Sequence, residues 1–177
     1  MRIALAIALV LGLSVPAWAD RQHGMQAFFA GDYATALPLL KADAEAGNAD
    51  SQFDLASMYD NGLGTKRDAA EAARWYHRSA MQGMHMAQYN LATMYEEGTG
   101  VAKDLVQAYF FYALASNGGP PYADRNRKSV GRRLSPTELE QARRLAQDFR
   151  PTPEHPAAAG AGAPPPSAPP PPETRSP

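Results

Sequence analysis

Apolar residues recur along two stretches of the chain with the three- and four-residue spacing of a buried helical stripe. Leu55, Met58 and Tyr59 form the first stripe, and the same three residue types recur 36 positions later. A glycine follows each stripe, at Gly62 and Gly98, and glycine readily adopts the left-handed backbone that ends a helix. The pattern therefore predicts amphipathic helices with defined ends.

The chain repeats itself with a period of 36 residues. Residues 49–83 and residues 85–119 share eleven identities in 35 aligned positions, against roughly two or three expected from average residue usage. Part of an earlier unit fits the same register, because Asp32 and Ala36 stand 36 positions before Asp68 and Ala72. The period therefore covers two complete units and one partial unit.

Each complete unit contains a second predicted helix after the glycines. Asp68 with Glu71, and Asp104 with Gln107, have the spacing of a capping box at a helix start. The helix that follows presents an alanine and two aromatic residues on one face, at positions 72, 75 and 76 and again 36 residues later. We expect these aromatic residues, and the methionines of the first helices, to pack in the core.

Residues 87–101, with Asp104, Ala108 and Tyr112, resemble the Sel1-like repeat, a relative of the tetratricopeptide repeat. The resemblance covers about residues 24–119, with a partial first unit that lacks the glycine-rich loop. It implies an all-α fold, a short α/α solenoid of helix pairs. It also implies a role as an adaptor, scaffold or regulator that binds other proteins.

The two ends of the chain differ in composition from the repeat region. Residues 1–19 place Arg2 before an apolar stretch and end in small residues, the pattern of a secretory signal cleaved after Ala19. A membrane anchor is the alternative, but thirteen apolar residues rise only about 20 Å against a hydrocarbon core of about 30 Å. Residues 151–177 are rich in Pro and Ala and predict a disordered, solvated tail. A periplasmic or secreted protein is expected.

A helical cap is predicted after the repeats. Ser135, Pro136 and Glu138 have the spacing of a helix start, and another helix is expected over residues 122–134. A cap covers the hydrophobic end of the stack. The expected organisation is a signal peptide at 1–19, a truncated repeat at 20–47, repeats at 48–83 and 84–119, a C-terminal cap at 120–150 and the tail at 151–177.

The predicted cap is basic. Its cationic residues are Arg125, Arg127, Lys128, Arg132, Arg133, Arg143 and Arg144. A solvated outer face is the simpler interpretation of such a charge run, and contact with an anionic partner is the other.

Residues that carry catalysis are sparse in this sequence. The chain contains no cysteine, which excludes disulfides, thiol catalysis and cysteine-based zinc sites. No nucleophile motif or metal-binding motif is recognised. We therefore expect neither an enzyme nor a cofactor; a cell-envelope hydrolase, as suggested for some cysteine-rich relatives, is the alternative. The net charge of −1 does not favour a nucleic-acid partner.

One cluster has the composition of a soft-metal site. Met81, Met84, His85 and Met86 lie within six residues, and thioethers with an imidazole can hold Cu(I). Methionine also fills gaps between packed elements, which is the interpretation that we favour. The sequence therefore predicts no metal, with these four residues as weak candidates.

The first helices of the units are expected to line the concave face of the solenoid, where related repeats hold peptides. Amides, aromatic rings, hydroxyls and carboxylates project from this predicted inner face. They are Gln52, Phe53, Ser57, Asp60, Gln88, Tyr89, Thr93 and Glu96. We expect this face to bind a peptide or a helix of a cell-envelope protein. The alternative for Phe53 and Tyr89 is packing between units.

Overall fold

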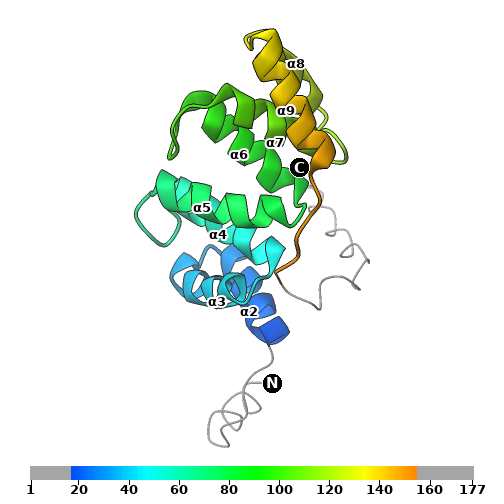
Figure 1. The fold of residues 1–177 in the computed structure, drawn as a ribbon. Helices are drawn as coiled ribbons and strands as arrows, with labels where there is room; N and C mark the ends of the chain where they lie inside the picture. Colours follow the sequence, from blue (N-terminus) through cyan, green and yellow to red (C-terminus); the bar gives the residue numbers. More distant parts are fainter. Residues whose placement is uncertain (1–16, 155–177) are drawn as a thin grey trace, which may run out of the picture.

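The computed structural model describes residues 17–154, which form eight α-helices and no strand (Figure 1). The helices are α2 (Ala17–Phe29), α3 (Tyr33–Glu45), α4 (Ala49–Asn61), α5 (Ala69–Met81), α6 (His85–Glu97), α7 (Leu105–Ala115), α8 (Ala123–Gly131) and α9 (Pro136–Asp148). This confirms the all-α prediction. Most of the predicted signal sequence and of the predicted tail lie outside the described residues.

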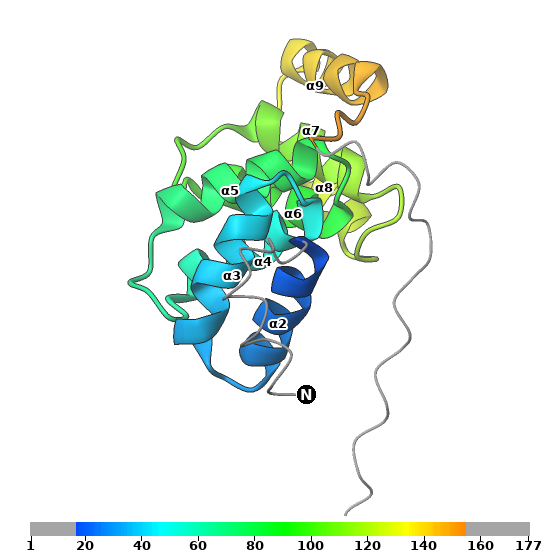
Figure 2. The same cartoon turned by 90° about the horizontal axis from the view of Figure 1, so that it is seen from below.

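Successive helices pack as antiparallel neighbours and build a stack from α2 and α3 at one end to α8 and α9 at the other (Figure 1). From α2 to α8 each helix contacts the next one along the chain, and α9 packs against α7. Figure 2 shows α9 beyond α7, on the side of the molecule away from α2. None of the helices within residues 17–154 combines the length and the apolar character that crossing a bilayer requires.

The predicted helix ends coincide with left-handed glycines. Gly62 ends α4 with φ of 68°, and Gly98 ends α6 with φ of 81°. The second helices begin at aspartate caps, where Asp68 accepts from the Glu71 amide at 2.9 Å and Asp104 accepts from two amides of α7.

One predicted detail of these caps is wrong. Glu71 does not return a hydrogen bond to its cap residue; its carboxylate instead pairs with Arg74 at 2.9 Å and accepts from the Trp75 indole at 2.9 Å. The reciprocal bond is absent because the Asp68 amide, which would donate it, instead donates to the Tyr59 carbonyl at 2.9 Å. The complete capping box predicted at Ser135 and Glu138 is present at the start of α9.

The 36-residue register continues into the cap. Ala123 and Val130 of α8 stand 36 positions after Ala87 and Met94 of α6, and all four side chains are buried. In contrast, Lys128 is exposed where the preceding unit has the buried Ala92. Therefore α8 takes the position of a further first helix while presenting a charged outer surface.

At the other end of the stack, a partly exposed arginine joins α2 to α3 and α4. Arg21 lies 3.3 Å from Asp50 and 4.0 Å from Asp43, and the Ser51 hydroxyl donates to Asp43 at 2.5 Å. Asp54 lies in the same region, and burial raises its pKa to about 6 against the opposing pull of Arg21, with Asp50 adding to the rise.

This raised pKa makes the free energy of unfolding depend on pH. Between pH 4 and pH 6 the folded chain binds more protons at Asp54 than the unfolded chain does, so stability decreases as the pH rises. We expect Asp54→Asn to stabilise the protein by roughly 1–2 kcal/mol at pH 7.5 and to change little at pH 4, measured by thermal unfolding. Equal effects of the substitution at both pH values would contradict this.

Candidate functional site

The two glutamines of the predicted inner face do not project from it. Gln52 is fully buried and its amide donates to the Ala44 carbonyl at 3.1 Å. Gln88 is also buried and donates to the Ala80 carbonyl at 3.0 Å. Each amide thereby adds a bond to a carbonyl in the last turn of the preceding helix, which also accepts from a backbone amide of the following turn. The prediction that these glutamines contact a partner is therefore corrected: they join adjacent units.

The two aromatic residues of the predicted inner face pack between helices while staying half-exposed. The Phe53 ring lies 5.8 Å from the Tyr76 ring, and the Tyr89 ring lies 5.5 Å from Tyr112 and 4.8 Å from Tyr122. These contacts agree with the alternative of packing between units. The half-exposed edges of both rings remain at the surface.

A hydroxyl of α6 lies within hydrogen-bond distance of a buried tyrosine of α7. Thr93 lies 3.0 Å from the Tyr112 hydroxyl, which also donates to Glu96 at 3.1 Å and receives a weak bond from Asn126 of α8. Burial raises the pKa of Tyr112 to about 12. The network therefore ties α6, α7 and α8 together.

The same arrangement of residue types recurs one unit earlier, because Ser57 and Asn90 stand 36 positions before Thr93 and Asn126. Burial raises the pKa of Tyr76 to about 12, and the neighbouring Asn90 and Ser57 oppose that rise. Ser57 therefore lies beside the buried tyrosine of its unit, as Thr93 does in the next.

The two carboxylates of the predicted inner face lie at its partly exposed edge. Asp60 keeps 32% of its side chain exposed and pairs with Arg67 at 3.2 Å, and Glu96 keeps 24% exposed and pairs with Arg133. With the edges of Phe53 and Tyr89, they leave a short polar and aromatic strip on α4 and α6.

Ion pairs occupy four of the seven cationic residues of the cap. Arg127 and Lys128 pair with Asp124 at 2.5 and 2.6 Å, Arg144 pairs with Glu140 at 3.1 Å, and Arg133 pairs with Glu96. The other three, Arg125, Arg132 and Arg143, are exposed and form no ion pair within residues 17–154. Contact with an anionic partner stays a prediction that rests on these three.

The Met and His cluster is accounted for by packing. Met81 and Met84 pack against the hydrophobic core, whereas Met86 is 37% exposed. The His85 ring bonds Gln88 at 3.1 Å and lies against Gly118. Each of Met81, Met84 and His85 therefore has a structural partner, in line with the interpretation favoured from the sequence.

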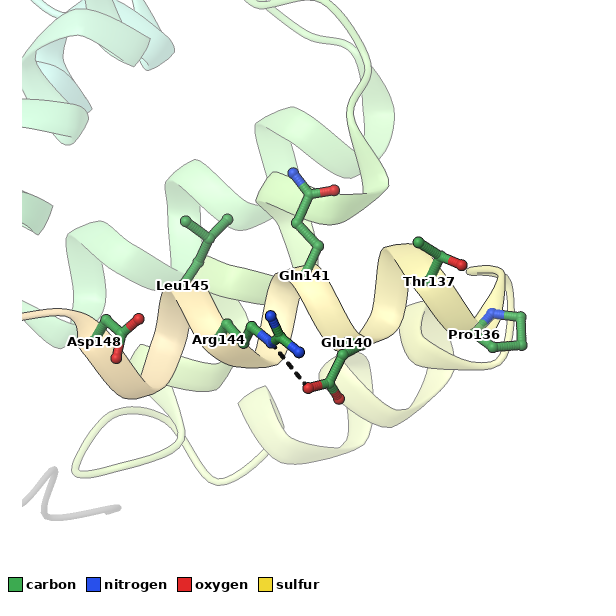
Figure 3. Close-up of a pocket in the computed structure, with 7 residues that line it drawn as sticks. All are labelled: Pro136, Thr137, Glu140, Gln141, Arg144, Leu145 and Asp148. Carbon is green, nitrogen blue, oxygen red and sulfur yellow. Dashed lines mark hydrogen bonds and ion pairs between the residues drawn. The ribbon is translucent and has the colours of Figure 1, made fainter.

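The outer face of α9 carries a shallow pocket of about 590 Å³ (Figure 3). All of its lining residues belong to this one helix, with Thr137, Gln141 and Leu145 on one side. Arg144 neutralises Glu140 at 3.1 Å (Figure 3). An open face of this kind offers a surface for contact rather than an enclosed site for chemistry.

The structure adds one contact that the sequence analysis missed. Residues Pro151–Glu154, here called the docked segment, were expected to be a free part of the tail, but they lie along the repeats (Figure 1). The Thr152 amide donates to the Met81 carbonyl at 3.0 Å, and the Glu154 amide donates to the Gln82 side chain at 3.0 Å. The expectation failed because two residues between the prolines keep their amide donors.

Comparisons with known proteins place the repeats in one family. The Sel1 repeat model matches residues 49–84 and 85–120. The chain is similar to the crystal structure of c5321, described as a protective antigen present in uropathogenic Escherichia coli strains displaying an SLR fold. The identity is 29% and the TM-score 0.69, over 75% of this chain and 29% of that one.

A second similar structure is a Sel1 repeat protein from Oxalobacter formigenes, with 28% identity and a TM-score of 0.59, over 73% of this chain and 56% of that one. The chain thus spans less than two thirds of either protein. No curated protein matches the chain. The chain therefore contains two Sel1 repeats and is similar in fold to two solved Sel1-like repeat structures.

Proposed function

We propose that this protein is an exported adaptor that binds a peptide or a helix of a cell-envelope protein on the inner face of α4 and α6. Its two Sel1 repeats support a role in protein–protein interaction. The observation that carries the proposal is the half-exposed strip of Phe53, Asp60, Tyr89 and Glu96.

The chemistry of this strip supports a peptide ligand. Two aromatic edges supply apolar contact area, and two carboxylates at its edge can accept hydrogen bonds from backbone amides or pair with basic side chains. Tyr89 is fixed by the Tyr122 ring and by a bond from Asn126 at 3.1 Å. A strip fixed in this way loses little side-chain entropy when a ligand binds.

Site-specific photocrosslinking in the producing cell tests the proposal. A photoreactive amino acid at Asp60 should give a discrete adduct with another protein, recovered outside the cytoplasm on a chain that begins at Asp20. The matched position is Gln147 on the far helix α9, which is exposed and should give no such adduct. Equal adducts at both positions, or a chain that retains residues 1–19, would contradict the proposal.

The aromatic edges should be required for this adduct. We expect Phe53→Ala combined with Tyr89→Ala to abolish the Asp60 adduct while the far-ultraviolet circular dichroism stays helical, since both rings lie at the half-exposed edge of the core. Phe29→Ala is the control, because Phe29 is 79% exposed at the other end of the stack. An adduct that survives the double substitution would show that the inner face is not the contact surface.

A further inference from the structure

The docked segment is bound by its backbone and by one side chain. The Thr152 amide donates to the carbonyl of Met81, the last residue of α5, and the Glu154 amide donates to the side-chain oxygen of Gln82, so alternate residues of the segment face the same side, as in an extended chain. The Glu154 carboxylate is bound separately, by Arg78 at 3.2 and 2.5 Å and by the Gln52 amide at 2.9 Å. Backbone and carboxylate are therefore recognised together.

The groups that bind Glu154 are held in place by the repeats themselves. Gln52 is fully buried and receives a bond from Gln82 at 2.8 Å, and Gln82 also donates to the Gly47 carbonyl at 3.0 Å. The Arg78 guanidinium lies over the Trp75 ring at 4.6 Å. Side chains that are positioned before the ligand arrives reduce the entropy cost of binding.

A glycine leaves the space that the segment fills. Gly47 has φ of 98°, and a Cβ at this position would lie 3.0 Å from the Glu154 Cβ. A side chain here would crowd the bound glutamate as well as strain the backbone.

The site is special to one junction of the stack. At the next junction Gln88 corresponds to Gln52, but Leu114 and Gly118 stand where this junction has Arg78 and Gln82. One unit earlier, the two positions hold alanines, at 42 and 46. Neither an arginine nor a glutamine is therefore required for two units to pack together. We attribute the arginine and the glutamine at this junction to binding of the docked segment.

We infer that the junction formed by Gln52, Arg78 and Gln82 is a binding site for an extended peptide segment that carries a glutamate, and that the docked segment occupies it as a tethered competitor of such a segment from another protein. The site shares no residue with the strip of Phe53, Asp60, Tyr89 and Glu96, so the inference does not rest on the proposed function.

The contacts of the docked segment are weak enough for another peptide to replace it. The side chains of Arg78 and Glu154 are 37% and 33% exposed, and solvent screening weakens an ion pair at that exposure. Tethering gives the docked segment a local concentration in roughly the millimolar range. A free segment that binds the site more tightly can therefore displace it.

A peptide titration tests the inference on the full chain. The probe is a synthetic peptide with the sequence of residues 150–154, blocked at both ends and added to the wild-type chain and to Glu154→Ala. The Arg78 Nε–H signal is followed by nuclear magnetic resonance. Because the substitution removes the competing carboxylate, we expect about tenfold tighter binding to Glu154→Ala than to the wild type.

Two further variants assign the binding to the site. In the Glu154→Ala background, Arg78→Ala should weaken binding of a fluorescein-labelled form of the peptide about tenfold, as for the loss of a charged hydrogen bond. Arg74→Ala should not, because Arg74 points away with 78% of its side chain exposed. Equal binding to the wild type and to Glu154→Ala, no binding to either, or equal binding of a peptide with glutamine in place of glutamate would overturn the inference.

Discussion

Gly100→Ala is expected to destabilise the protein by about 3 kcal/mol and to lower its Tm by roughly 10 °C. Gly100 adopts φ of 72°, and a Cβ there would lie 2.1 Å from the carbonyl oxygen of Ala69, the first residue of α5. The obstacle is backbone, which a side-chain rotation cannot relieve. The loop of the second unit would have to move off the start of the preceding helix.

Gly31→Ala separates this clash from backbone strain. Gly31 has a similar φ of 76°, but nothing lies within 4 Å of an added Cβ, so only the left-handed penalty of about 1 kcal/mol applies. Thermal unfolding of both variants measures the difference. Equal losses would show that the close approach of Gly100 to α5 does not contribute to stability.

The same close approach occurs one unit earlier. A Cβ at Gly64 would lie 2.5 Å from the carbonyl oxygen of Tyr33, the first residue of α3, and both positions stand 36 residues before Gly100 and Ala69. The second glycine of each loop thus allows the loop to contact the second helix of the preceding unit, whereas the first glycine ends the helix before the loop.

Tyr112→Ala is expected to cost about 4 kcal/mol, the usual range for deleting a buried aromatic side chain. Tyr112 is 1% exposed and lies between the Tyr89 ring and the hydroxyl of Thr93. Its loss would leave a cavity beside α8 and would remove the partner of Glu96. We expect faster hydrogen exchange in α8 than in α4, because the cap is attached through this residue.

Tyr112→Phe separates the ring from its hydroxyl. This variant keeps the packing but loses the bonds to Thr93 and Glu96, so a loss of about 1–2 kcal/mol is expected. Denaturant unfolding of the two variants gives the comparison. If the phenylalanine variant were as unstable as the alanine variant, the hydroxyl network and not the ring would hold the cap.

The repeat and the helices were predictable because they rest on local physics. The stripe of Leu55, Met58 and Tyr59 and the left-handed glycine after it require only the geometry of a single helix. Because the same residue types recur 36 positions later, the prediction for one unit also applies to the next. The Sel1 resemblance placed on these residues is confirmed by the matched repeats and by the structural neighbours.

The inner face was harder to predict, because polar side chains on a helix can serve either a partner or the protein itself. Gln52 and Gln88 turn toward carbonyls at the end of the preceding helix, and helical spacing within one unit does not reveal that acceptor. A signal for the junction site was nevertheless present. Arg78 and Gln82 are polar where the other units carry small or apolar residues.

The docked segment was missed because composition averages over its residues. A proline-rich stretch is depleted in amide donors, yet Thr152 and Glu154 retain theirs and find acceptors on α5 and in the turn after it. Glu154 also provides the one carboxylate between Asp148 and Glu173. The contacts of this single glutamate with Arg78 and Gln52 could not be inferred from the average composition of the tail.

A stack of repeats in which each unit contacts only its neighbours can melt one unit at a time from either end. The bond between Gln52 and Glu154 links residues 102 apart in sequence, and it connects the chain beyond α9 to the first helix of the first complete unit. Unfolding of the cap would then release a contact at the opposite end of the repeats. The docked segment therefore couples distant units in a single cooperative transition, at the cost of slower closure of a long loop during folding.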